Sequence, residues 1–168
     1  MFVLLLMTCF FCLAMTLKGG VEYTIEDARK LAFENVSKQI DINQYKEYFI
    51  DPNFEENQLL LSKNKYSAKN RYLAKFLNNE YGVHYKKKPN ENFYYRSNGH
   101  LYKVEIITNS KYPKISGMYN VKGDLERVSI TVKYSHSFLF DINETLLFYW
   151  IKKNCYNNKG ELINTREY

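Results

Sequence analysis

Apolar positions in the first half of the chain recur at the spacing of a helix. The sequence TIED at 24–27 is a capping box, in which Thr24 accepts a backbone hydrogen bond and Asp27 reaches back toward it. Behind it, apolar side chains return every three or four residues as far as Ile40. This stripe predicts a helix over 24–41.

Two further helical segments are expected before the period changes. The sequence NQYKEYFID at 43–51 predicts a short helical turn that ends before the next proline, because the residue preceding proline avoids helical dihedral angles. An apolar stripe over 67–81, with a serine as N-cap and a glycine after it, predicts a second long helix. Between them, Leu59 to Leu61 fit a strand, a helix or a buried connection.

From Phe93 onward the period of the pattern changes from 3.6 to 2. The sequences LYKVEII (101–107) and ERVSITVKY (126–134) alternate apolar and polar residues, so each predicts a strand with one buried face. The sequences SFLFDI (137–142) and TLLFYWI (145–151) are more uniformly apolar, which predicts strands near the middle of a core.

Helices followed by strands predict an α+β fold. We expect the N-terminal helices, in a helical part at 21–82, to pack on one face of a C-terminal antiparallel β-meander, in a β-hairpin part at 93–168. The aromatic content, with sixteen Tyr and eleven Phe, agrees with a sheet-rich fold. At 168 residues, the length suits one domain with a real hydrophobic core.

A short pattern occurs four times in the predicted meander. It consists of an aromatic residue, three residues, glycine, one residue and leucine: YRSNGHL (95–101), YNVKGDL (119–125), FDINETL (140–146) and YNNKGEL (156–162). Glycine adopts a positive φ without the penalty of a Cβ atom, so each copy predicts a hairpin turn. The third copy has Glu144 in place of glycine, and we expect Asn143 to supply its left-handed residue.

This pattern resembles the tyrosine–aspartate repeats of bacterial surface and toxin-shell proteins, and the Tyr-rich Gly-Leu hairpin repeats of some antitoxin-like proteins. The tail at 155–168 is similar to the ends of uncharacterised exported bacterial proteins, a likeness that implies no activity. The copies are 24, 21 and 16 residues apart. A repeat shell keeps its period, so the spacing favours four ordinary hairpins in one meander.

The N-terminus contains sixteen residues without a charge, at 2–17. Such a segment is short for a membrane span, and its length suits the apolar region of a signal peptide. A basic residue before it and a clean cleavage site are both missing, so retention as an anchor and a misplaced start are alternatives, as is a buried core helix. We expect a signal peptide or membrane anchor at 1–20, a domain at 21–168, and a periplasmic, extracellular or membrane-anchored location.

Cys155 is the one cysteine outside the apolar segment. The mature domain is therefore expected to lack an internal disulfide and to depend on its core alone. A lone cysteine of this kind is predicted to be a small buried hydrophobic residue.

The net charge of +6 is concentrated in one part of the chain. Between His84 and Gly123 lie eight basic and two acidic residues, whereas the rest of the chain has equal numbers of each. Lysine and arginine alternate there with tyrosine and phenylalanine, a composition that neutralises an anionic polymer and stacks on its rings. The candidate binding residues are Lys86, Lys87, Lys88, Tyr94, Arg96, Lys103, Lys111, Lys114 and Lys122.

The expected partner is an anionic polymer, an anionic membrane surface or a protein. Nucleic acid is less favoured, because an exported domain more often meets lipid headgroups, wall polymers or acidic glycans. A retained anchor would hold the lysines near a bilayer, where anionic lipid attracts each by roughly 1 kcal/mol. A solvated lysine-rich loop is the simpler reading of the same residues.

The alternative function is a small basic secreted hydrolase or ribonuclease. His84 and His100 would supply an acid and a base, and Glu91 a carboxylate, within the cationic segment. The spacing of these residues is not diagnostic of any enzyme. No metal or cofactor is expected, since the histidines have no metal-ligand spacing and there is no glycine-rich phosphate loop. The sequence therefore favours an exported, non-enzymatic α+β domain whose basic aromatic segment contacts an anionic surface or partner.

Overall fold

The computed structural model describes residues 15–16 and 22–166. The apolar segment at 2–17, predicted to be a signal peptide or anchor, lies outside the described residues except for Met15–Thr16. These two residues form β1, which pairs with β2 (Glu22–Tyr23) in a small antiparallel sheet.

The capping box predicted at the start of the first helix is confirmed. In α1 (Ile25–Glu34), Thr24 Oγ1 accepts from the Asp27 amide at 3.0 Å, and the Asp27 carboxylate accepts from the Thr24 amide at 3.1 Å. The helix ends at Glu34, earlier than predicted. The residues after it, 35–51, instead run along the sheet, and we call them the N-terminal strap. Its backbone pairs with the sheet: Ile40 N donates to Gly123 O at 2.9 Å.

The short helical turn before the first proline is also confirmed, as the 3₁₀ helix η1 (Ile42–Tyr48). Its N-cap is Asp41, whose carboxylate accepts from the Asn43 amide at 3.0 Å. The ambiguous leucines lie in a helix, α2 (Phe54–Ser62).

The helix predicted over 67–81 is wrong. This segment forms β3 (Ser67–Ala68), β4 (Arg71–Lys75) and the short turn η2 (Leu77–Asn79), and it leads into β5 (Tyr81–Tyr85). Its burial alternates along β4 and not with a helical period, because pairing with β5 fixes the extended backbone. Strands therefore begin inside the part at 21–82 that was predicted to be helical.

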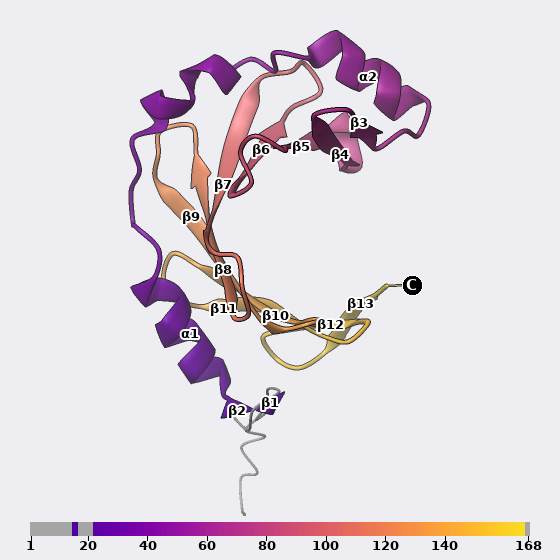
Figure 1. The fold of residues 1–168 in the computed structure, drawn as a ribbon. Coiled ribbons are helices and arrows are strands. Elements are labelled where there is room, and N and C mark those ends of the chain that lie inside the picture. Colours follow the sequence, from indigo (N-terminus) through magenta and orange to yellow (C-terminus); the bar gives the residue numbers. More distant parts are fainter. Residues whose placement is uncertain (1–14, 17–21, 167–168) are drawn as a thin grey trace, which may run out of the picture.

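An eleven-stranded antiparallel meander forms the rest of the molecule (Figure 1). Every strand pairs with its neighbours in sequence, in the order β3 to β13. With helices in the N-terminal part and this sheet in the C-terminal part, the fold is α+β, as predicted. The remaining strands are β6 (Glu91–Tyr95), β7 (Leu101–Asn109), β8 (Lys114–Asn120), β9 (Leu125–Lys133), β10 (His136–Asp141), β11 (Leu146–Ile151), β12 (Asn154–Asn157) and β13 (Leu162–Thr165).

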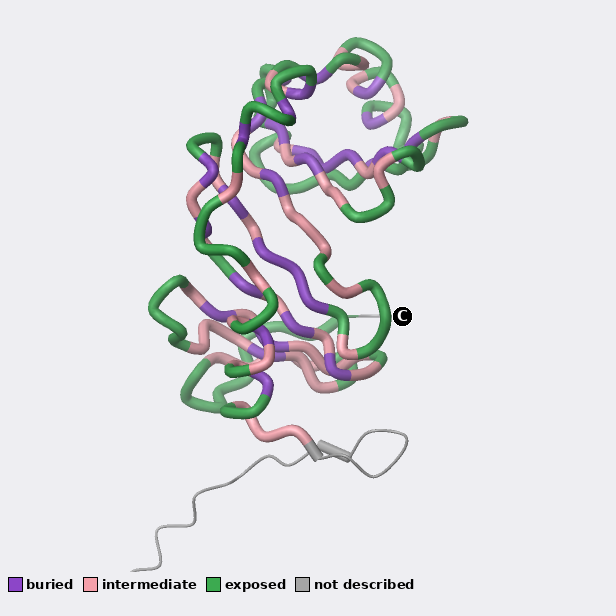
Figure 2. The backbone as a smooth tube through the Cα atoms, turned by 60° about the vertical axis from the view of Figure 1, so that its left-hand side comes forward, coloured by how far each residue is buried: buried purple, intermediate pink, exposed green. Residues whose placement is uncertain are grey.

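Two hydrophobic clusters form the core, and Figure 2 shows where the buried residues lie along the backbone. In the first, Ala28 and Ala32 of α1 pack against Val128 and Ile130 of β9, the latter two at alternate positions as predicted. In the second, η1 contributes aromatic rings to β5 and β6. The Tyr48 ring stacks on Phe93, with centroids 4.3 Å apart.

The expectation that β10 and β11 lie near the middle of the core is only partly met. In β10, Phe138 and Phe140 are fully buried. In β11 only Tyr149 is buried, because this strand is the third from the C-terminal edge of the sheet. Cys155, on the neighbouring β12, is buried as predicted, and burial raises the pKa of its thiol.

All four copies of the repeated pattern form hairpin turns of one geometry. In each copy the amide of the fifth residue donates to the carbonyl of the second residue. Gly99, Gly123 and Gly160 have positive φ angles of 79°, 87° and 80°. In the third copy the left-handed residue is Glu144, with φ of 63°, and not Asn143 as predicted, because the turn requires positive φ at the fifth position whatever residue lies there.

Two of these turns anchor the N-terminal strap. Besides the contact at Gly123, Leu125 N donates to Lys38 O at 3.0 Å. The turn of the first copy, at Gly99, also binds the strap. Asp51 N donates to Gly99 O, and Leu101 N donates to Phe49 O, both at 2.9 Å. The repeated turn thus has a structural role at copies one and two.

A matched pair of glycine substitutions tests this role. A Cβ atom at Gly123 would lie 2.2 Å from the backbone oxygen of Ile40, whereas at Gly160 the nearest contact is the Tyr149 hydroxyl at 3.7 Å. We expect Gly160→Ala to lower the free energy of unfolding by about 1 kcal/mol, from its left-handed backbone alone, and Gly123→Ala by at least about 2 kcal/mol. Urea unfolding measures both values, and equal losses would contradict the anchoring role.

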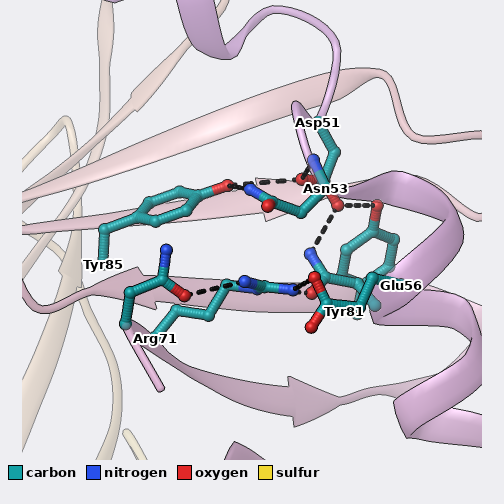
Figure 3. A network of polar contacts seen from close by, with 8 residues as sticks. Asp51, Asn53, Glu56, Arg71, Tyr81 and Tyr85 are labelled. Carbon is teal, nitrogen blue, oxygen red and sulfur yellow. Dashed lines mark hydrogen bonds and ion pairs between the residues drawn. The ribbon is translucent and has the colours of Figure 1, made fainter. Parts of the chain in front are cut away.

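A buried polar network joins the segment before α2 to β4 and β5 (Figure 3). Asp51 is only 3% exposed. Its carboxylate accepts hydrogen bonds from the Tyr81 hydroxyl at 2.7 Å and from the Asn57 side-chain amide at 2.8 Å. Arg71 Nε donates to Asn57 Oδ1 at 2.7 Å, and Arg71 Nη2 forms an ion pair with Glu56 Oε2 at 2.7 Å. Since nearly all of these groups are buried, the network serves the fold.

Candidate functional site

One end of the sheet gathers basic residues from connections that are far apart in the sequence. Because each strand of a meander reverses direction, every second connection lies at this end, from β3–β4 to β11–β12, together with the residue after β13. Neighbouring connections there are two strands apart, or about 10 Å. We call the cations in and beside them, apart from the buried Arg71, the basic rim: Lys69, Lys86, Lys87, Lys88, Lys111, Lys114, Lys133, Lys152, Lys153 and Arg166.

Carboxylates are scarce along the basic rim. In the described chain, Glu91 at the start of β6 is the one acidic residue in or beside these connections. Glu47 of η1 is a further neighbour, since its charge acts on Lys87. The charges of the rim also affect a neighbouring histidine. Burial lowers the pKa of His136, and the charges of Lys133 and Lys152 lower it further. Cations from two adjacent connections therefore lie within electrostatic reach of one side chain.

Aromatic rings accompany the cations. Lys86 Nζ lies 5.0 Å from the centroid of the Tyr72 ring, and Lys114 Nζ lies 4.9 Å from that of Tyr112. At the tip of the β9–β10 connection, Tyr134 is 74% exposed. Interleaved cations and exposed rings are the composition that binds charged polymers made of rings.

The opposite end of the sheet differs in both charge and occupation. Its connections and the strand ends beside them carry four cations, Lys75, Arg96, Lys122 and Lys159, against five carboxylates, Glu80, Asp124, Asp141, Glu144 and Glu161. Two of its turns are covered by the N-terminal strap through the backbone hydrogen bonds at Gly99 and Gly123. Among the described residues, positive charge is thus segregated to one end of the sheet.

The structure does not bring the nine predicted binding residues together. The five that lie on the basic rim are Lys86, Lys87, Lys88, Lys111 and Lys114. Arg96 and Lys122 belong to turns at the opposite end. Tyr94 and Lys103 face each other across β6 and β7, and Lys103 Nζ forms an ion pair with Glu126 Oε2 at 2.9 Å.

Sequence reasoning missed half of the basic rim. Lys69, Lys133, Lys152, Lys153 and Arg166 lie outside the stretch at 84–123 that holds the excess charge. The signal that would find them is the alternation of turns in a meander, which requires the boundaries of every strand.

A small pocket of about 210 Å³ opens over β4 and β5. Two ring pairs line it: Tyr72 with His84, whose centroids are 6.2 Å apart, and Phe76 with Tyr94, at 5.9 Å. Gly82 lies beneath these rings, since a Cβ atom there would be 3.3 Å from Phe76 Cε2. The absence of a side chain at Gly82 therefore leaves the space between the rings open.

Glu105 orients the polar side chains beside this pocket. Its Oε2 accepts from Asn92 Nδ2 and from the Tyr94 hydroxyl, both at 2.8 Å, and its Oε1 accepts from the Ser116 hydroxyl at 2.6 Å. With its nitrogen turned to Glu105, Asn92 presents Oδ1 to His84 Nδ1 at 2.8 Å. Since an amide oxygen only accepts, His84 donates from Nδ1, so Nε2 is the nitrogen that carries a lone pair when the ring is neutral.

The residues of the predicted enzymatic alternative are not brought together. His84 lies on β5 and contacts Asn92, not Glu91. His100 lies in the β6–β7 turn at the opposite end of the sheet, where it forms an isolated bridge with Ile50. His84 and His100 therefore do not lie in one pocket.

In the described part of the chain, no group of three or more His, Cys, Asp or Glu side chains is arranged to hold a metal ion. The helices described there are all too short or too polar to cross a membrane. Comparison of the chain with family models, curated proteins and solved structures found no match.

Proposed function

We propose that this chain is an exported or membrane-anchored, non-enzymatic domain that binds an anionic polymer along the basic rim. The observation that carries the proposal is the segregation of charge: ten cations and one carboxylate lie at one end of the sheet, whereas the opposite end has a slight excess of acid. The uncharged segment at 2–17 supports the export or anchoring of the chain.

The proposal includes an arrangement of the helices that keeps the rim accessible. We infer that α1, η1 and α2 cover one face of the sheet, supported by the packing of α1 on β9 and of η1 on β5 and β6. The other face and the basic rim are then accessible to a partner. The strap occupies turns at the opposite end, which makes that end a poor binding surface.

A row of cations about 10 Å apart suits a linear polymer that carries repeated negative charges. Each contact is worth little alone, because exposed ion pairs contribute about 0–1 kcal/mol. Several contacts along one chain add up, and the released counterions make the affinity depend on salt. We therefore propose a polymer, and not a small anion, as the partner.

Salt dependence tests this function with the full chain and polygalacturonate, a polymer of acidic sugar rings. If four or more cations are neutralised, we expect the affinity to fall by about 50-fold between about 50 and 200 mM NaCl, with log K linear in log salt. Isothermal titration calorimetry measures the affinity at each concentration.

An affinity that does not change with salt would contradict binding through the rim. Vesicles of phosphatidylglycerol and phosphatidylcholine serve as the comparison in the same experiment. Tighter salt-dependent binding to the vesicles than to the polymer would replace the polymer with a membrane surface as the partner.

A further inference from the structure

The pocket over β4 and β5 has the shape and surface of a site for a single ring. Its volume of about 210 Å³ is smaller than the 300–1,000 Å³ or so typical of pockets for drug-sized ligands. Tyr72 and Phe76 at its sides are 51% and 42% exposed, although aromatic rings of this size are usually more deeply buried. Exposed rings on either side of an open space offer stacking surfaces to a flat, apolar ring face.

The polar groups beside the pocket are mainly hydrogen-bond acceptors. His84 Nδ1 donates to Asn92 Oδ1, which leaves Nε2 as the acceptor of the neutral ring. Glu105 is an acceptor only, and its carboxylate already binds three donors. A ligand that complements this edge must bring donors of its own, and hydroxyl groups meet that need.

Positive charge lies directly beside the ring site. Lys86 Nζ is 5.0 Å from the centroid of Tyr72, and it also donates to the backbone oxygen of Lys69 at 2.9 Å. A negative group attached directly to a ring that stacks in the pocket suits this placement of Lys86 beside Tyr72. The carboxylate of a uronate is attached in this way, whereas a nucleotide phosphate is separated from its base by the sugar.

We propose that this pocket binds one pyranose ring of an acidic glycan, a uronate whose carboxylate faces Lys86 and whose hydroxyls donate to the polar edge at His84. The inference rests on the proposed function, because the rest of the glycan continues along the basic rim, on which Lys86 lies. The pocket supplies the selection for a sugar ring, and the rim supplies most of the attraction for charge.

The test compares a polyanion with rings and a polyanion without rings. Trigalacturonate presents uronate rings, and inorganic polyphosphate presents charge alone. Loss of one stacking surface costs about tenfold in affinity, so we expect Tyr72→Ala and Phe76→Ala each to weaken trigalacturonate binding by about tenfold and to leave polyphosphate binding within about twofold. Tyr66→Ala removes an exposed ring that belongs neither to the pocket nor to the basic rim, and is expected to change neither.

The outcomes separate this inference from the proposed function. If the chain binds both probes and the pocket variants bind trigalacturonate as tightly as the unmodified chain, the ring site is wrong and the rim stands. Binding of polyphosphate but not of trigalacturonate leads to the same conclusion. Binding of neither probe overturns both proposals. An equal or larger loss for oligothymidylate in the pocket variants would make the ring a nucleobase and overturn the glycan.

Discussion

Replacing Asp51 with alanine is expected to lower the free energy of unfolding by about 3–5 kcal/mol, the largest stability loss we predict for a single side chain in this molecule. The carboxylate is buried, and it accepts hydrogen bonds from the Tyr81 hydroxyl, the Asn57 side chain and the Asn53 amide. The substitution leaves these three donors, and the Tyr85 hydroxyl at 3.3 Å, without this acceptor in a buried site. Each unsatisfied buried donor costs about 1–3 kcal/mol.

Asp41→Ala provides the matched control. Asp41 also accepts a backbone amide, as the N-cap of η1, but it is exposed. Its loss is expected to cost about 1 kcal/mol, because water replaces the missing hydrogen bond. Urea unfolding of both variants measures the difference at an unchanged m-value. A loss at Asp51 no larger than the loss at Asp41 would show that the network does not hold α2 to the sheet.

The second large effect concerns charge and not stability. Four exposed cations of the basic rim, Lys86, Lys111, Lys114 and Lys153, can be changed together to glutamine. A matched variant changes the four cations of the opposite end, Lys75, Arg96, Lys122 and Lys159. Each variant removes four positive charges from a net charge of +6 and so carries +2. Any difference between them reports the position of the charge, because the total is the same.

We expect the rim variant to bind polygalacturonate about 100-fold more weakly at low salt, which corresponds to about 0.7 kcal/mol for each lost contact. The opposite-end variant is expected to bind within about threefold of the unmodified chain, because distant charges act only through the screened field of the protein. Both variants change exposed residues, so their unfolding is expected to differ little from that of the unmodified chain.

Local signals in the sequence predicted local structure well. The capping box at Thr24 depends on residues three positions apart, and both of its hydrogen bonds form. The alternation at Val128 and Ile130 is likewise reproduced, since neighbours on one strand share the same sheet. The repeated turns require a positive φ at their fifth position, and glycine, which adopts that backbone most readily, lies there in three of the four copies.

Signals that depend on distant pairing were misread. The segment at 67–81 carries an apolar stripe that suits a helix, yet Leu73 pairs with Val83 across two strands. A short amphipathic pattern does not distinguish these outcomes, and the partner strand decides. Asp51, Asn57 and Arg71 show no pattern at all in the sequence, because their network exists only when α2 lies on β4.

The candidate site was predicted in part, for a geometric reason. A cationic stretch in sequence crosses the sheet several times, so its residues divide between the two ends. Lys114 is the first residue of β8, and Lys122 follows the end of β8. The two lysines therefore lie at opposite ends of this strand. Lys152 joins the basic rim from a connection that carries no unusual charge in its own neighbourhood of the sequence.

The affinity of the two charge-matched variants for polygalacturonate is the most direct test of the basic rim. Titration calorimetry at about 50 mM NaCl gives both values under one set of conditions, where surface charges are weakly screened. The basic rim as the binding surface predicts a loss of about 100-fold for the rim variant and at most about threefold for its partner. Equal losses would mean that net charge alone attracts the polymer, and a larger loss at the opposite end would contradict the rim as the binding surface.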